Sequence, residues 1–133
     1  MSLKHEWITL QGIRIHYFQA GASRAPVILL HGGGTDSASL SWGHLIGPLS
    51  MHYQVFAPDW PGYGASDRPA VEHSLSLYIS ILADFIQVLS IEKPSLIGIS
   101  MGGAAALGFT LANPERVNKL VLVDSYGLQD RFA

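Results

Sequence analysis

The sequence predicts an α/β fold: a mostly parallel β-sheet with helices on both faces and an antiparallel hairpin at its N-terminus. Short and almost continuously apolar runs recur along the chain, as is typical of strands buried on both faces. Segments with apolar residues three and four positions apart separate these runs and favour helices. Strands that alternate with helices predict a parallel sheet, and a chain of 133 residues is long enough for one domain.

The N-terminal third is expected to supply a hairpin, a buried strand and a short helix. Residues 7–10 and 13–18 alternate in polarity on either side of a glycine turn, which predicts the hairpin. Residues 26–30 are apolar almost throughout and predict a strand. Residues 39–49 predict a short helix, although two glycines weaken it.

The remaining elements continue the alternation of strand and helix. Apolar spacing over residues 74–90 predicts an amphipathic helix with Ser74 as its N-cap. A helix of small residues over 101–112 is expected to stop at Asn113-Pro114. The strands expected around these helices cover residues 55–57, 95–97 and 119–123.

A GxSxG pattern, with Gly98, Ser100 and Gly102 as its fixed residues, stands between a predicted strand and a predicted helix. This context is typical of a sharp turn that presents a serine as a nucleophile. Gly98 and Gly102 lack the side chains that would collide across such a turn. At the N-terminus of the helix, the backbone N–H of Met101 favours negative charge that develops on a substrate. The alternative is a chance match in a glycine-rich loop.

A second motif, His31-Gly32-Gly33-Gly34, follows the strand predicted at 26–30. Glycines let the backbone turn its N–H groups into a cavity, as an oxyanion hole requires. A histidine beside such a turn is expected to brace the loop by hydrogen bonds. The alternative role for His31 is a catalytic base, but in folds with this elbow the base follows the nucleophile along the chain.

A third motif begins at Asp59, where the strand predicted at 55–57 gives way to a loop rich in Pro and Gly. Loops of this kind line sites at the carboxyl ends of parallel strands. We expect Asp59 and Ser66 to fix the loop by hydrogen bonds between side chain and backbone. A catalytic role for Asp59 is the alternative.

With these motifs in this order, the chain resembles the α/β-hydrolase family over nearly all of its length. The glycine turn, the DxPGxGxS loop, the GxSxGG elbow and the step to the last strand all have counterparts there. The resemblance implies that Ser100 is the nucleophile and that the N–H groups of Met101 and Gly33 form the oxyanion hole. It also implies that the lid follows the last predicted strand and that the catalytic acid and histidine follow later strands, so that residues 1–133 form one domain, the N-terminal part of the fold.

The catalytic acid and base have few candidates in this chain. Asp124 ends the last predicted strand, where some members of the family carry their acid; a loop residue is the alternative. None of the six histidines follows Ser100, and none has the spacing of metal ligands. The histidines expected at surface or capping positions are His16, His44, His52 and His73.

Composition restricts the setting and the partners. Charged residues make up 14% of the chain and hydrophobic residues 48%, which suggests an apolar surface that a C-terminal segment or a second copy covers. A net charge of −2 without basic runs argues against nucleic acid. The lack of cysteine excludes disulfides and thiolate metal sites, and no metal or cofactor is implied. Without a membrane-spanning run or a signal-peptide pattern, a cytoplasmic protein is expected.

The chemistry expected of a complete site is acyl transfer to Ser100 from an ester or a similar small-molecule carbonyl substrate. Because no histidine follows Ser100, the site is expected to be incomplete in this chain, or to take a histidine from another chain. A protein of this fold that binds a ligand or a partner without catalysis is the alternative. Within the family, the motifs resemble carboxylesterases and the carbon-carbon bond hydrolases of aromatic ring cleavage, which commonly carry Asn where Ile99 stands.

Overall fold

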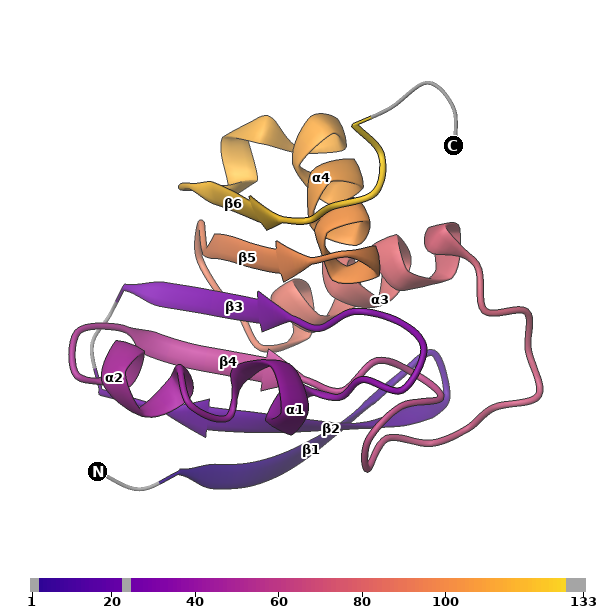
Figure 1. The fold of residues 1–133 in the computed structure, drawn as a ribbon, viewed down its shortest axis with the longest axis horizontal. Helices are drawn as coiled ribbons and strands as arrows, with labels where there is room; N and C mark the ends of the chain where they lie inside the picture. Colours follow the sequence, from indigo (N-terminus) through magenta and orange to yellow (C-terminus); the bar gives the residue numbers. More distant parts are fainter. Residues whose placement is uncertain (1–2, 23–24, 129–133) are drawn as a thin grey trace.

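The computed structural model describes residues 3–22 and 25–128, and within them a six-stranded sheet has the order β1-β2-β4-β3-β5-β6 (Figure 1). Four strands are parallel, so their C-terminal ends lie at one edge of the sheet. The predicted fold class and the predicted strands are confirmed. The parallel strands are β3 (Pro26–Leu30), β4 (Gln54–Pro58), β5 (Ser95–Ile99) and β6 (Leu120–Val123).

The predicted hairpin consists of β1 (Lys4–Leu10) and β2 (Ile13–Ala20). Gln11 and Gly12 join them with φ angles of 54° and 75°. Two successive positive φ angles are the geometry of a type I′ turn, whose twist matches that of the strands. Because β2 also pairs antiparallel with β4, the hairpin extends the parallel part of the sheet on one side.

Helices cover both faces of the sheet, and each face has its own apolar core. α3 (Leu75–Val88) and α4 (Met101–Ala112) lie on one face, while the short α1 (Ala38–Trp42) and α2 (Ile46–Ser50) lie on the other (Figure 1). Ile28 and Leu29 are adjacent in β3 but belong to different cores. Successive side chains of a strand point to opposite faces, so a strand covered on both faces is apolar throughout.

The single helix predicted over residues 39–49 is wrong, because α1 and α2 replace it. In a continuous helix, the ring of Pro48 would collide with the carbonyl of His44, one turn earlier. The chain instead ends α1 at Gly43 and begins α2 at Ile46, which places Pro48 in the first turn of α2. A proline is tolerated there because the N–H that it lacks has no acceptor within the helix.

The two longer helices lie where the sequence predicts them. The Ser74 hydroxyl oxygen caps α3 by accepting a hydrogen bond from Leu77 N at 3.1 Å. Asn113 ends α4, and Pro114 begins a single 3-10 turn, η1 (Pro114–Arg116). Within the described residues, no helix is both long and apolar enough to cross a membrane.

The sheet presents an apolar edge at β6, which pairs only with β5 in the part of the chain that the structure describes. Val121 is 46% exposed and Val123 is 37% exposed, and Leu111 on the neighbouring α4 is 73% exposed. An exposed strand edge with apolar side chains is a surface that folded proteins usually cover.

The packing of α4 predicts a large difference between two residues of that helix. Phe109 is fully buried in the core beneath α4, whereas Leu111 is mostly exposed. We expect Phe109→Ala to lower the free energy of unfolding by about 3 to 5 kcal/mol, because it leaves a cavity. Leu111→Ala, the control in the same helix, should change it by less than about 0.5 kcal/mol. Urea unfolding measures both, and equal effects would contradict this packing.

Candidate active site

Ser100 occupies a strained turn between the end of β5 and the start of α4. Its φ of 53° and ψ of −117° lie in a region that residues with side chains rarely adopt. Three backbone hydrogen bonds hold it there: Ser100 N donates to Val123 O at 3.0 Å, and Ser100 O accepts from Ala104 N at 3.1 Å and from Tyr126 N at 3.4 Å. The elbow that the sequence predicts is therefore present at the C-terminal edge of the sheet.

Two glycines permit this turn because the first turn of α4 lies directly against the strands. A Cβ atom built on Gly98 would lie 2.5 Å from Gly102 O and 2.7 Å from the Gly103 Cα. A Cβ atom on Gly102 would collide with the carbonyl oxygens of Leu30 and His31. Any larger residue at either position would push α4 away from the sheet and change the direction in which Ser100 points.

The glycine turn after β3 lies beside Ser100 and Met101. A Cβ atom built on Gly32 would lie 3.3 Å from the Ser100 Cβ, and one on Gly33 would lie 3.4 Å from the Met101 Sδ. Met101 is the first residue of α4, so its N–H has no acceptor within the helix. The structure thus brings together Ser100, Gly32, Gly33 and Met101, while Gly34 (φ 73°) continues the turn.

His31 is fully buried, and both of its ring nitrogens have partners. Its Nδ1 lies 2.7 Å from Gly32 O, and its Nε2 lies 3.1 Å from Trp60 N. Because Trp60 N can only donate, Nε2 accepts and Nδ1 carries the proton. Burial lowers the pKa of His31 below its ordinary value. This neutral ring fixes the turn to the loop after β4, and no nitrogen remains to act as a base toward Ser100.

Asp36 also holds the glycine turn in place, and the sequence motifs did not predict this role. Its Oδ2 accepts from Gly32 N at 2.7 Å and from Ser41 Oγ at 2.6 Å, and its Oδ1 accepts from Ser37 N at 2.7 Å. Burial alone would raise the pKa of this carboxyl, but these hydrogen bonds lower it below its ordinary value. The sequence signal was an acid in the Thr-Asp-Ser stretch after the glycines, a typical turn-forming arrangement.

Asp59 is buried, and its carboxylate joins three segments that surround the site. Oδ1 accepts from Ala38 N at 2.9 Å, and Oδ2 accepts from Ala65 N at 3.1 Å and lies 2.8 Å from His16 Nδ1. Ser66 Oγ donates to Asp59 O at 2.7 Å and accepts from His16 N at 2.9 Å. These bonds confirm that Asp59 and Ser66 fix the loop.

The expectation that His16 is a surface or capping residue is wrong. His16 is only 3% exposed, because both faces of β2 are covered at this position. Besides its contact with Asp59, the ring lies 3.0 Å (Nε2) from Nδ1 of the exposed His5 and packs against Phe18. The other three histidines expected at the surface are exposed: His44, His52 and His73.

A catalytic acid and base are not assembled around Ser100 in the part of the chain that the structure describes. No histidine there forms a hydrogen bond with Ser100. Asp124 directly follows Val123, whose carbonyl oxygen binds Ser100 N, but its side chain is exposed. Among the described residues no group of three or more His, Asp or Glu side chains is placed to hold a metal ion.

A mostly parallel sheet with a serine on a strained turn between strand and helix defines the α/β-hydrolase class. Residues 25–133 match the family described as alpha/beta hydrolase fold, and the chain therefore belongs to that family.

Among its relatives is the 2-hydroxy-6-oxo-6-(2'-aminophenyl)hexa-2,4-dienoic acid hydrolase of Metapseudomonas resinovorans, which is 40% identical over 92% of this chain. The 2-hydroxy-6-oxo-6-phenylhexa-2,4-dienoate hydrolase of Burkholderia cepacia is 39% identical over 90% of this chain. The crystal structure of a serine hydrolase involved in carbazole degradation superimposes with a TM-score of 0.88 and 32% identity over 99% of this chain. The chain spans 42% of the length of each of the two curated relatives and 52% of the solved chain.

The contact between α4 and the strands predicts that Gly102 tolerates no side chain. We expect Gly102→Ala to lower the free energy of unfolding by about 3 kcal/mol, since the new methyl group meets backbone atoms that cannot move aside. Gly47→Ala is the matched control, because Gly47 lies inside α2 with open space around it. It should raise stability by about 0.5 to 1 kcal/mol. A Gly102→Ala chain as stable as the wild type would refute the close contact.

Burial of His31 predicts a loss of stability in mild acid. As the pH falls below 6.5, the unfolded chain takes up a proton at His31 that the folded chain refuses until its lower pKa is reached. The free energy of unfolding therefore decreases as the pH decreases through this window, by at most about 1.4 kcal/mol per pH unit for one proton. Urea unfolding between about pH 7.5 and about pH 5.5 measures this slope.

The slope should become smaller in His31→Gln and stay unchanged in His44→Gln, an exposed control. If His31→Gln does not fold, ¹⁵N NMR of the wild-type ring reports the same property directly. A ring that is half protonated at pH 6.5, the ordinary pKa of histidine, would contradict the assignment of His31 as a buried, neutral brace.

Proposed function

We propose that this chain carries the nucleophile and the oxyanion-binding part of a serine hydrolase that acts on an ester or a similar carbonyl substrate. One observation carries the proposal: Ser100 sits on a strained elbow (φ 53°) with the glycine turn against its Cβ. Strain of this kind persists only where the surrounding structure enforces it, and it is concentrated at functional sites.

The proposed reaction begins when Ser100 Oγ attacks the substrate carbonyl and gives its proton to a base. The carbonyl oxygen becomes an oxyanion that the N–H groups of Met101 and Gly33 stabilise. The Gly32 N–H is already bound to Asp36, so the next N–H along the turn is left for the substrate. Loss of one such donor typically costs about 3 to 4 kcal/mol of transition-state stabilisation. Collapse of the intermediate leaves an acyl group on Ser100, which water then removes as the acid.

The base is proposed to lie in a segment that follows the described residues, and its acid partner either lies in that segment or is Asp124. An unassisted serine hydroxyl is a poor nucleophile, and no histidine follows Ser100 in the sequence. The exposed apolar edge formed by β6 and Leu111 is the surface that such a segment, or a second copy of the chain, would cover. Asp124 remains a candidate for the acid because it follows the strand that binds Ser100 N.

The relatives favour one substrate class within this proposal. Two of them are named as hydrolases of 2-hydroxy-6-oxo-hexadienoates, compounds whose 6-oxo group is a carbonyl. We propose that the substrate of the whole protein is a carbonyl compound of this type and that the protein acts in the cytoplasm. Carbon-carbon bond hydrolases commonly carry asparagine where this chain has Ile99. The chain is nevertheless 40% and 39% identical to these two relatives.

The acyl-enzyme predicts that Ser100 is acetylated by p-nitrophenyl acetate. Without a base, attack on the ester is slow, but hydrolysis of the acetyl group is slow as well, so the adduct should accumulate. Peptide mass spectrometry of the purified chain should find one acetyl group on the peptide that contains Ser100. The adduct should be absent in Ser100→Ala and unchanged in Ser76→Ala, an exposed serine of α3.

Labelling that is equal in all three proteins, or that falls only on lysines, would contradict nucleophilic catalysis by Ser100. The alternative is a ligand-binding protein derived from this fold. It would be supported if the folded chain stays unlabelled, and if wild type and Ser100→Ala bind a 2-hydroxy-6-oxo-hexadienoate equally well.

A further inference from the structure

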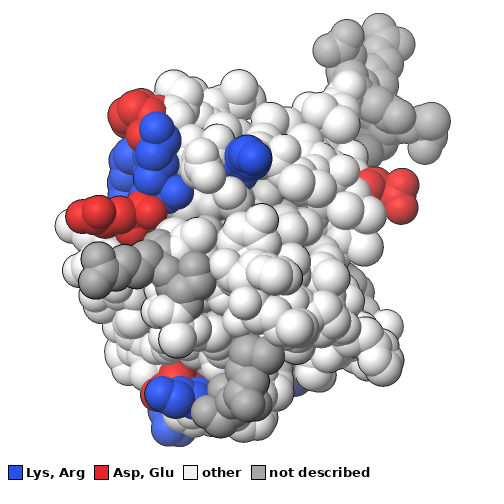
Figure 2. Space-filling model, turned by 90° about the vertical axis from the view of Figure 1, so that its left-hand side faces the viewer, with Lys and Arg blue, Asp and Glu red and all other residues white. Residues whose placement is uncertain are grey.

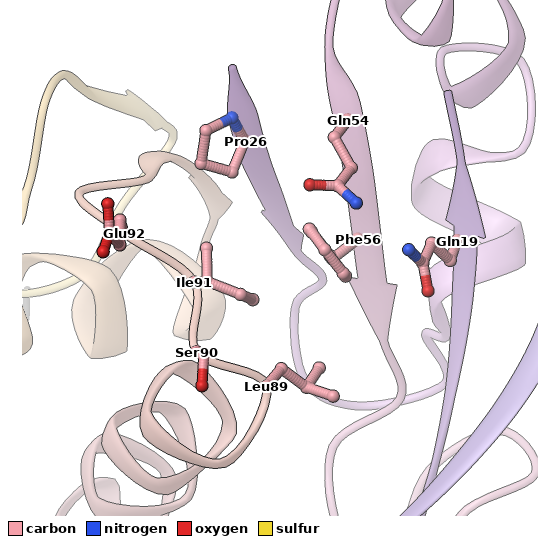
Figure 3. Close-up of a pocket in the computed structure, with 8 residues that line it drawn as sticks. All are labelled: Gln19, Pro26, Gln54, Phe56, Leu89, Ser90, Ile91 and Glu92. Carbon is pink, nitrogen blue, oxygen red and sulfur yellow. The ribbon is translucent and has the colours of Figure 1, made fainter. Parts of the chain in front are cut away.

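A hollow of about 350 Å³ lies at the end of the sheet opposite Ser100. It is formed where β3 and β4 begin and β2 ends, whereas Ser100 follows the end of β5. Its volume is within the usual range of small-molecule sites. The lining residues, labelled in Figure 3, are Gln19, Pro26, Gln54, Phe56, Leu89, Ser90, Ile91 and Glu92.

The strand register explains why this hollow is present. Gln19 in β2 pairs with Phe56 in β4, and Gln54 lies two residues before Phe56, so all three side chains share one face of the sheet. α3 covers that face over most of its length, but it ends at Val88. Beyond its end, the chain turns through Ser90 (φ 52°) toward β5, and the side chains of Gln19 and Gln54 remain only half-buried.

Two carboxamides face this hollow without partners. Gln19 and Gln54 are both half-buried, and neither side chain forms a hydrogen bond with any described residue. Figure 3 shows them beside the Phe56 ring, across from Leu89 and Ile91. Each carboxamide offers two N–H donors and one acceptor oxygen. Half-buried polar groups that lack partners gain from a ligand that supplies both a donor and an acceptor.

The rest of the lining selects against negative charge. Phe56 is only 4% exposed and Ile91 is also buried, so they give the hollow an apolar floor and wall. No lysine or arginine is among the lining residues, and Glu92 places a carboxylate at the rim. Figure 2 views this end of the molecule, where charged side chains form a few clusters and most of the surface is uncharged. Among the lining residues an anion therefore finds no positive side chain, although Lys4 in β1 pairs with Gln19, whereas a neutral amide finds hydrogen-bond partners in the two carboxamides.

We propose that this hollow is a second binding site, separate from Ser100, for a neutral aromatic amide. The aromatic ring lies on Phe56 between Leu89 and Ile91, and the amide group pairs with the Gln19 and Gln54 carboxamides. The proposal is independent of hydrolase activity, because no lining residue takes part in the site at Ser100.

Benzamide is the probe, and benzoate is its anionic counterpart of the same shape. In ¹H–¹⁵N NMR spectra of the 133-residue chain, benzamide should shift the side-chain NH₂ signals of Gln19 and Gln54 and the backbone signals of residues 89–92. Half-saturation is expected on the order of 1 mM, as is usual for so small a ligand. Benzoate should bind about tenfold more weakly, because it cannot donate a hydrogen bond and meets Glu92.

Gln54→Met keeps the length of the side chain but removes its hydrogen bonds, and it should weaken benzamide binding about tenfold. Gln87→Met, an exposed glutamine of α3 outside the hollow, is the matched control and should leave binding unchanged. Three results would each overturn the proposal: no shifts up to about 20 mM benzamide, shifts confined to residues around Ser100, or equal binding by wild type and Gln54→Met. Benzoate that binds as tightly as benzamide would overturn the selection against charge.

Discussion

The site depends on the closeness with which the first turn of α4 lies against the ends of β3 and β5. No side chain fits at Gly98 or Gly102, so backbone meets backbone at this point of the fold. This contact places Ser100 in its strained conformation and sets Met101 beside the glycine turn. The four small residues 103–106 that follow in α4 are all buried and continue the close packing along the sheet. The geometry of the elbow is therefore a property of the whole layer arrangement and not of five residues alone.

A buried carboxylate provides the second constraint. Asp59 is charged and buried, which is costly unless hydrogen bonds replace the lost water. Its three side-chain contacts reach α1, the Pro/Gly loop and β2. His31 and Asp36 add similar bonds around the glycine turn, so each loop at this edge of the sheet is tied to its neighbour. Polar side chains thus set the shape of the loops that surround the elbow.

Local patterns predicted the elements whose reasons are local, such as β3, with its apolar run, and α4, with Asn113-Pro114 at its end. These local patterns gave wrong predictions where another feature, such as a proline or a contact distant in the sequence, decided the structure. The ring of Pro48 divides the segment predicted as one helix, and a proline so far inside that segment was the signal for the break. His16 lies at a position that alternation in a half-exposed hairpin assigns to solvent, but the other face of β2 is covered as well. The contacts of Asp36 and the hollow near Gln54 join residues that only the three-dimensional structure brings together.

The attachment of the N-terminal hairpin has a consequence for the dynamics of the protein. β1 and β2 are joined to the rest of the sheet by backbone hydrogen bonds along a single seam with β4. Units of this kind open and close as a whole, at a lower free energy than global unfolding requires. While the hairpin is open, β4 becomes a bare strand edge that another polypeptide can pair with. The bonds between His16 and Asp59 cross this same seam, so they hold the hairpin against β4 as well as shape the loops.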